Sequence, residues 1–154
     1  MKTRGFEVVK GFDEVNINLP ARSTKNSAGY DFECAEDVEI PSFWDFETGK
    51  PTLVKTGVKA YMPEDEALFL YNRSGNPGKK GLVLANSVGV VDSDYYGNPD
   101  NDGHIMFAFY NFFPETVTLK AGERIGQGIF QKFYKIDQDV ALSSRQGGFG
   151  STKG

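Results

Sequence analysis

The sequence predicts an all-β domain with a jelly-roll-like β-barrel or sandwich architecture, followed by a flexible C-terminal arm. Three observations favour this fold class. The 154 residues include 18 glycines and 7 prolines that divide the chain into short apolar segments, 13 phenylalanines and 7 tyrosines favour strands, and the 3.6-residue periodicity of amphipathic helices is scarce. Regularly spaced short strands are typical of barrels and sandwiches. We expect residues 1–142 to form the β-barrel domain and residues 143–154 to form the arm.

Apolar runs between turn residues mark the expected strands. Residues 15–19 alternate as V-N-I-N-L, the pattern of a half-buried strand. Gly126 and Gly128 lie inside the last strand and indicate a bulge or the close approach of another group. Outside residues 81–97, the predicted strands are residues 6–9, 15–19, 30–35, 38–40, 52–62, 67–72, 104–113, 115–120 and 124–134.

Composition and charge exclude several classes of function. The formal net charge of −4 argues against a nucleic-acid surface built on a broad basic face. No apolar run approaches the roughly 18 residues of a membrane span. Cys34 and His104 are the single cysteine and histidine, so we expect no intramolecular disulfide and no histidine-based zinc site. The composition predicts a soluble cytoplasmic protein with Cys34 buried and His104 in a turn or at the surface.

Residues 81–97, GLVLANSVGVVDSDYYG, carry the clearest sign of a functional site. We predict a β-hairpin with Asn86 and Ser87 at its turn, whose turn residues form a nucleotide pocket. After the turn, Asp92, Asp94 and two tyrosines crowd into a segment where an ordinary buried strand avoids unpaired charge. The alternative is a solvated hairpin end in which aspartate serves only as a turn former.

Two further segments contain groups that bind phosphate. Residues 73–75 (RSG) combine a guanidinium, a hydroxyl and backbone N–H groups, although a plain turn has the same composition. Residues 143–154, SSRQGGFGSTKG, contain one large apolar residue, Phe149, among glycines, hydroxyls and Arg145. This composition is typical of a disordered tail, and it also suits an arm that stacks on a base and wraps phosphates.

Taken in order, five segments resemble the five motifs of the homotrimeric dUTP pyrophosphatases, the dUTPases. They are residues 28–32 (AGYDF), 73–75 (RSG), 86–97 (ending in GVVDSDYYG), 124–127 (RIGQ) and 145–152 (RQGGFGST). Each motif alone is weak, but together they follow the family's order and approximate spacing over nearly the whole chain. The resemblance implies a jelly-roll-like barrel that hydrolyses dUTP to dUMP and pyrophosphate with Mg²⁺. Such an activity keeps uracil out of DNA and supplies dUMP for dTMP synthesis.

The resemblance also implies roles for individual residues. Asp92 corresponds to the general base that activates the water for in-line attack on the α-phosphate. Tyr95 corresponds to the ring beneath the deoxyribose that excludes a 2′-hydroxyl, and Asn86 with the hairpin backbone corresponds to the uracil reader. Asp31 corresponds to a residue that reaches the metal through water. The other residues implied in substrate binding are Arg73, Ser74, Gly75, Val91, Gln127, Arg145, Phe149, Gly150, Ser151 and Thr152.

Family members assemble as homotrimers with shared active sites. The first, second and fourth motifs come from one subunit, the hairpin from a second and the arm from a third. This sequence departs from the family pattern in three places. Only Gln146 separates Arg145 from Gly-Gly-Phe, residues 76–80 (NPGKK) predict a shortened or absent helix, and the loop at residues 98–103 looks longer than is typical.

Two other interpretations remain open. A dCTP deaminase has a similar fold, but GVVDSDYYG with Asp92 is the hydrolase version of the motif, and no glutamate base matches. A nucleotide-sensing protein on the same fold would instead use dUTP binding to control a regulatory protein partner. The loops at residues 43–50 and 98–103 are the candidate contacts for such a partner. In either case we expect no direct nucleic-acid or membrane binding.

Overall fold

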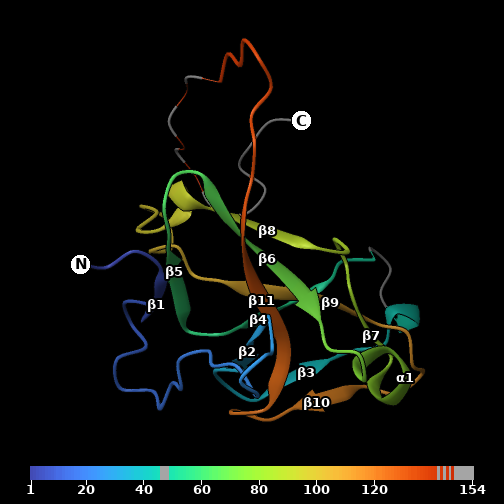
Figure 1. The fold of residues 1–154 in the computed structure, drawn as a ribbon. Coiled ribbons are helices and arrows are strands. Elements are labelled where there is room, and N and C mark those ends of the chain that lie inside the picture. The colour runs from blue at the N-terminus through green and yellow to red at the C-terminus, as the bar shows by residue number, and fades with distance from the viewer. Residues whose placement is uncertain (46–48, 142, 144, 146, 148–154) are drawn as a thin grey trace.

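The computed structural model describes residues 1–45, 49–141, 143, 145 and 147, and it is mostly β-structure, as predicted (Figure 1). The strands are β1 (Gly5–Val8), β2 (Tyr30–Glu33), β3 (Val38–Ile40), β4 (Thr52–Lys55), β5 (Val58–Tyr61), β6 (Glu66–Asn72), β7 (Leu82–Leu84), β8 (Gly89–Asp92), β9 (Met106–Asn111), β10 (Val117–Leu119) and β11 (Arg124–Lys132). The short helices are η1 (Phe43–Asp45), α1 (Asn76–Lys80) and η2 (Ser93–Tyr95).

The described strands pair antiparallel in four sheets. The largest has the order β2-β11-β6-β8, a second has the order β4-β9-β7, and β1-β5 and β10-β3 form two-stranded sheets. Phe32 of β2 and Phe107 of β9 are both buried, and their ring centroids lie 5.5 Å apart, so the two larger sheets share one core. This packing agrees with the predicted jelly-roll-like fold. The hydrogen bonds between the described strands do not close into a single barrel.

β7 and β8 are the two strands predicted within residues 81–97, but they do not pair with each other. β7 pairs with β9 and β8 pairs with β6, so the hairpin prediction is wrong. The chain crosses between the two larger sheets through residues 85–88, where Ser87 adopts a φ of 63°. Leu82 of β7 and Val91 of β8 are both buried in the core. β7 and β8 belong to different sheets that share one core, and each strand directs an apolar side chain into it.

Two other strand predictions also fail. Residues 15–19 form no strand: Val15 and Leu19 are exposed, and the N–H of Ile17 bonds locally to the carbonyl of Val15. The predicted strand at residues 52–62 is divided into β4 and β5 at Gly57, whose φ is 72°. A Cβ at Gly57 would lie 2.8 Å from Cδ1 of Ile17, so both the backbone conformation and the close contact require glycine.

The glycines of β11 let this central strand contact aromatic rings directly. A Cβ on Gly126 would lie 2.2 Å from the Phe107 ring, and one on Gly128 would lie 2.9 Å from the Phe32 ring. The register of β11 against β2 also shifts between Arg124 and Gly126. Both predicted reasons for these glycines, a bulge and a close approach, are therefore confirmed.

Cys34 is buried as expected, whereas His104 is not at the surface. His104 is 6% exposed, and its Nε2 accepts the N–H of Gly57 at 2.8 Å. Burial, followed by the positive charge of Lys55, lowers the pKa of His104 to about 4, so the ring is neutral at pH 7. The surface prediction failed because a single polar residue beside a loop carries no signal of burial. Within the described residues, no helix is long and apolar enough to cross a membrane.

Candidate active site

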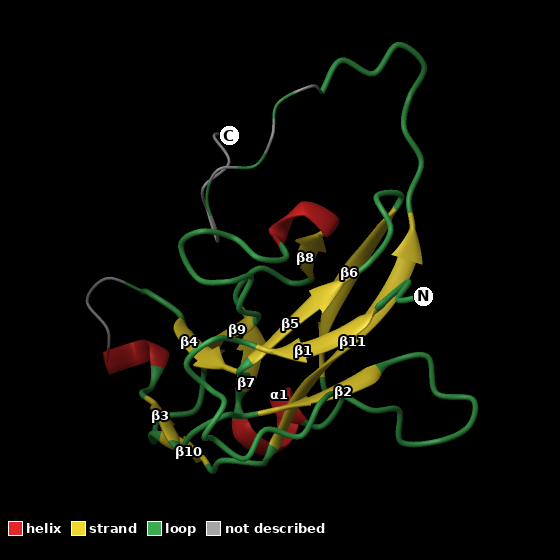
Figure 2. Ribbon diagram, turned by 90° about the vertical axis from the view of Figure 1, so that its left-hand side faces the viewer, coloured by secondary structure: helices red, strands yellow, loops and turns green. Residues whose placement is uncertain are grey.

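The predicted site residues gather at the two ends of the four-stranded sheet. Ala67 near the start of β6 pairs with Asp92 of β8, and Tyr71 near the end of β6 pairs with Gln127 of β11. α1 lies beyond one end of β6, and η2, which follows Asp92, lies at the other (Figures 1 and 2). We call these regions the Gln127 end and the Asp92 end.

At the Gln127 end, Gln127 pairs directly with Asp31 of β2. Directly opposite residues of antiparallel strands place their side chains on the same face, with Cβ atoms about 5 Å apart. A Cβ on Gly29 would lie 2.2 Å from Oε1 of Gln127, so glycine makes room for the carboxamide. Oδ2 of Asp31 accepts the Ser23 hydroxyl at 2.6 Å and lies 3.8 Å from Nη1 of Arg124. The first and fourth motifs therefore form one polar surface.

Residues 73–75 follow β6 at the same end. Nη1 of Arg73 donates to the Arg124 carbonyl at 3.2 Å, which places the guanidinium beside β11. Asn76 is buried, and its Nδ2 donates to Oδ1 of Asn72 at 2.8 Å and to the Ile125 carbonyl at 3.0 Å. α1 begins at Asn76 and spans five residues, so the helix after the RSG segment is short but present. The structural role of Asn76 was not predicted, although the Asn-Pro dipeptide was an available signal for it.

The oxygen donors at this end suit Mg²⁺. Asp31 and Gln127 offer carboxylate and carboxamide oxygens, the hard ligands that this ion prefers. Among the described residues, no group of three or more His, Cys, Asp and Glu side chains could hold a metal ion. Mg²⁺ commonly keeps several waters and binds through one or two carboxylates plus substrate phosphates. The donor set therefore fits an ion bound mostly by nucleotide and water.

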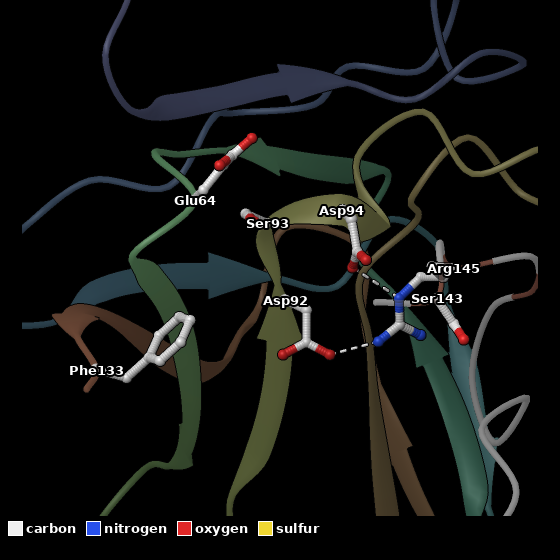
Figure 3. Close-up of a pocket in the computed structure, with 7 residues that line it drawn as sticks. All are labelled: Glu64, Asp92, Ser93, Asp94, Phe133, Ser143 and Arg145. Carbon is white, nitrogen blue, oxygen red and sulfur yellow. Dashed lines mark hydrogen bonds and ion pairs between the residues drawn. The ribbon is translucent and has the colours of Figure 1, made fainter. Parts of the chain in front are cut away.

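At the Asp92 end, the guanidinium of Arg145 lies between two carboxylates that line an open pocket (Figure 3). Nε of Arg145 donates to Oδ1 of Asp94 at 2.9 Å, and Nη2 donates to Oδ2 of Asp92. The hydrogen bond to Asp94, followed by the charge of Asp92, raises the pKa of Arg145. The pocket is lined by Glu64, Asp92, Ser93, Asp94, Phe133, Ser143 and Arg145.

Tyr95 lies next to this pocket in η2 and is 5% exposed. Its hydroxyl donates to the His104 carbonyl at 2.5 Å and accepts Nδ2 of Asn101 at 2.8 Å. Burial raises the pKa of Tyr95. The Tyr95 hydroxyl is thus held by Asn101 of the loop at residues 98–103 and by His104, which follows that loop. The sugar-sorting role implied for Tyr95 stays a prediction.

Asn86 precedes β8, and Val91 lies within it. Asn86 is exposed in the turn at residues 85–88, whereas the Val91 side chain is buried in the core. β8 is an edge strand of its sheet, so one side of its backbone faces away from β6. The Val91 side chain is therefore not available to a ligand, and a ligand at this edge would meet the backbone of β8.

One chain does not bring the two ends together. Asp92 and Gln127 point to the same face, but they are separated by four residues along β6 and by two strand spacings. At about 3.3 Å per residue and about 4.8 Å per strand, their separation is roughly 16 Å. A general base must lie about 3 Å from the atom that gives up the proton, or reach that atom through one water. Asp92 is thus too far from Gln127 and Arg73 to share a substrate phosphate with them in the same chain.

The two loops predicted to contact a protein partner differ in structure. Trp44 in the first loop is 68% exposed, while its Nε1 donates to the Phe112 carbonyl at 3.2 Å. In the second loop, Oδ2 of Asp102 accepts Nζ of Lys59 at 2.8 Å and the backbone N–H of Lys10 at 3.0 Å. Part of the first loop, residues 46–48, lies outside the described residues, and partner binding by either loop stays a prediction.

Of the arm residues predicted to bind substrate, Arg145 is described, whereas Phe149, Gly150, Ser151 and Thr152 lie outside the described residues. For the described arm residues, three contacts were not predicted, and the first is the ion pair of Arg145 with Asp92. Asp94 binds Arg145, and Nδ2 of Asn98 donates to the Gly147 carbonyl at 2.7 Å. Asn98 precedes Pro99, so it carries the same Asn-Pro signal as Asn76.

The chain is similar to known proteins in both sequence and structure. The sequence model of the dUTPase family matches residues 15–153. A deoxyuridine 5′-triphosphate nucleotidohydrolase of Lactococcus lactis subsp. lactis is 52% identical over 154 residues, 99% of each chain. One of Acinetobacter baylyi is 35% identical over 140 residues, 87% of each chain.

Solved structures show the same similarity. The crystal structure of a dUTPase from Streptococcus mutans is 50% identical and superposes with a TM-score of 0.78, covering 86% of this chain and 98% of its own. A dUTPase from phage phi11 of S. aureus shares the fold at 20% identity, with a TM-score of 0.70 over 92% of this chain and 98% of its own.

Proposed function

This chain belongs to the dUTPase family and hydrolyses dUTP, and from that premise we propose how its residues carry out the reaction. A water activated by Asp92 attacks the α-phosphate in line, and dUMP and pyrophosphate leave. The carboxylate of Asp92 lies at the exposed end of β8, where a water can reach it. The product dUMP is then available for dTMP synthesis, and removal of dUTP keeps uracil out of DNA.

The Gln127 end binds the triphosphate in this proposal. Arg73 and the backbone of Ser74 and Gly75 donate to phosphate oxygens, and Asp31 and Gln127 would hold Mg²⁺ through water. Mg²⁺, when bound with the substrate, neutralises phosphate charge, which is the main requirement of phosphoryl transfer.

The Asp92 segment binds the nucleoside. Asn86 and the outward backbone of β8, at Val91, read the uracil edge. The Tyr95 ring lies beneath the deoxyribose, where it leaves no volume for a 2′-hydroxyl. Arg145, Phe149, Gly150, Ser151 and Thr152 complete substrate binding from the arm.

The observation that carries this proposal is the separation of roughly 16 Å between Asp92 and Gln127 within one chain. A site that needs both groups at one triphosphate must take them from different copies. We propose a homotrimer in which Asp92 of one subunit faces Asp31, Arg73 and Gln127 of the next, with the arm coming from the third.

The substrate is tested by measuring pyrophosphate release from dUTP, dTTP, dCTP and UTP. We expect release from dUTP at a kcat/KM well above the other three. Ammonia release from dCTP without pyrophosphate would instead identify a deaminase.

The shared site is tested by mixing inactive Asp92→Asn and inactive Arg73→Ala proteins, unfolding them and refolding them together. Every mixed trimer contains one site with an intact Asp92 and an intact Arg73. Random assembly of equal amounts makes about three-quarters of the trimers mixed, so activity should recover to roughly a quarter of wild type. A site built within one chain would recover none, because every chain lacks one of the two residues.

A further inference from the structure

The segment before β2 is tied to the edge of the four-stranded sheet. β2 is an edge strand, so one side of its backbone has no neighbouring strand within that sheet. Ala21 occupies part of this side, because its carbonyl accepts the N–H of Asp31 at 2.8 Å in an antiparallel bridge. Residues 22–28 therefore form a loop whose start is fixed beside Asp31.

Arg22 holds this loop together from within. Its Nη1 donates to the carbonyls of Lys25 at 2.6 Å and Ser27 at 3.2 Å. The N–H of Ser27 donates to the Thr24 carbonyl at 3.2 Å, and the Ser27 hydroxyl accepts the N–H of Thr24 at 3.2 Å. A charged donor makes stronger hydrogen bonds than a neutral one, so the loop has a defined shape although most of its residues are exposed.

Ser23 lies between these two attachments, and its hydroxyl donates to Oδ2 of Asp31 at 2.6 Å. A hydroxyl that bonds to a carboxylate at this distance makes a charge-assisted hydrogen bond. Nη1 of Arg124 lies 3.8 Å from the same oxygen. Within the part of the chain that the structure describes, Oδ1 of Asp31 accepts no hydrogen bond. The two carboxylate oxygens thus have different surroundings.

This difference matters because the carboxylate of an aspartate can turn. The torsion that rotates it has broad minima, so an unrestrained Asp31 would exchange the positions of its two oxygens. The side chain of Asp31 is 20% exposed, and Gln127 lies opposite it on the same face of the sheet. The bond from Ser23 restrains Oδ2 and leaves Oδ1 for a water.

We propose that Ser23 is a positioning residue, which holds the carboxylate of Asp31 in the orientation that binds Mg²⁺ through water. This inference rests on the proposed function, because it takes Asp31 as a residue that holds the ion with the triphosphate. Ser23 and Asp31 belong to the same chain, so the arrangement is complete within each subunit. Ser23 acts through Asp31 and needs no contact of its own with the substrate.

Ser23→Ala is tested by calorimetric binding of a dUTP analogue that has an imido group in place of the α,β-bridging oxygen and is not hydrolysed. With Mg²⁺ present, the loss of one hydrogen bond should weaken binding roughly three- to tenfold. With EDTA in place of Mg²⁺, binding should be unchanged, because the hydroxyl acts only on a group that holds the ion. Ser23→Thr keeps the hydroxyl and should bind like wild type in both conditions.

Asn26→Ala is the matched control, because Asn26 is an exposed polar residue of the same loop and its side chain bonds to no other described residue. It should leave binding unchanged in both conditions. Ser23 is also exposed, so Ser23→Ala should keep the melting temperature of wild type. If Ser23→Ala weakened binding equally in Mg²⁺ and in EDTA, Ser23 would only shape the loop, and the proposal would be overturned. Unchanged binding in both conditions would overturn it as well.

Asp31→Asn separates this inference from the proposed function. If Ser23 acts through Asp31, Ser23→Ala should add nothing to the effect of Asp31→Asn when the two changes are combined. A full additional loss in the double variant would contradict the positioning role. If Asp31→Asn weakens binding in Mg²⁺ but Ser23→Ala does not, the proposed function stands and the inference alone fails. If Asp31→Asn itself leaves binding in Mg²⁺ unchanged, the proposed role of Asp31 fails together with that of Ser23.

Discussion

The two ends of the four-stranded sheet differ in the charge they present. The Asp92 end has two exposed carboxylates that share the guanidinium of Arg145. At the Gln127 end, the guanidinium of Arg124 lies 3.8 Å from the carboxylate of Asp31, and the guanidinium of Arg73 donates to the Arg124 carbonyl. Carboxylates can accept a proton from water, and guanidinium groups can hold phosphate oxygens. One chain therefore carries both sets of groups that the proposed site needs but keeps them roughly 16 Å apart.

Among the variants considered, Asp92→Asn at the Asp92 end should lower kcat the most. Loss of a positioned general base lowers kcat by roughly 10²- to 10⁴-fold, while folding and dUTP binding should persist because Asp92 is exposed. Steady-state pyrophosphate release and calorimetric binding of dUTP separate the two effects. The exposed Asp100→Asn serves as the control, and activity of Asp92→Asn within threefold of wild type would contradict the assigned role.

The Gln127 end can be disturbed alone by Gly29→Ala. The added methyl group would lie 2.2 Å from Oε1 of Gln127 and should displace the carboxamide. A displacement of about 1 Å at a positioning residue can lower kcat/KM by roughly 10- to 100-fold. Gly78→Ala is the matched control, because nothing lies within 4 Å of its Cβ. Unchanged kcat/KM in Gly29→Ala would show that Gln127 is not needed at the phosphates.

Acid should destabilise the loop behind the Asp92 end through His104. Its pKa is about 4 in the folded protein and about 6.5 when unfolded, so the unfolded chain binds more protons between these values. Stability is therefore fully present above pH 6.5 and decreases as the pH falls towards 4, by about 2 kcal/mol between pH 7 and 5.

Urea unfolding at pH 7 and 5 measures this effect. In His104→Gln, whose carboxamide oxygen can still accept the Gly57 N–H, the decrease should be smaller by about 2 kcal/mol. An equal decrease in both proteins would assign the acid sensitivity to carboxylates instead. Amide exchange should rise first near residues 98–104, and not at the Gln127 end.

Tyr95→Ala tests the proposed role of the Asp92 end in selecting the sugar. The proposed ring excludes a 2′-hydroxyl by volume, so its removal should lower the dUTP/UTP ratio of kcat/KM by roughly tenfold. Tyr95→Phe keeps the ring and loses the hydroxyl that bonds to His104 and Asn101, so it should keep the ratio. If Tyr95→Ala also keeps the ratio, sugar selection lies elsewhere.

Local pattern was enough to place most strands. β1, β2, β3, β6, β9, β10 and β11 lie where alternation and turn residues predict them, because these signals depend on neighbours in the chain. Residues 15–19 show the limit of this reasoning. Their alternation is that of a strand, but a strand also needs a pairing partner, and the N–H of Ile17 bonds within its own segment instead.

The sequence by itself determined the fold class, the family and the chemical groups available at each motif, such as the carboxylate of Asp92 and the guanidinium of Arg73. Only the tertiary structure decided that β7 and β8 lie in different sheets, that His104 is buried, and that Arg145 lies against Asp94. It also decided that Asp92 of β8 and Gln127 of β11 pair with opposite ends of β6. Residue types are properties of the chain, whereas strand pairing, burial and ion pairing depend on residues distant in sequence, whose contacts no local pattern specifies.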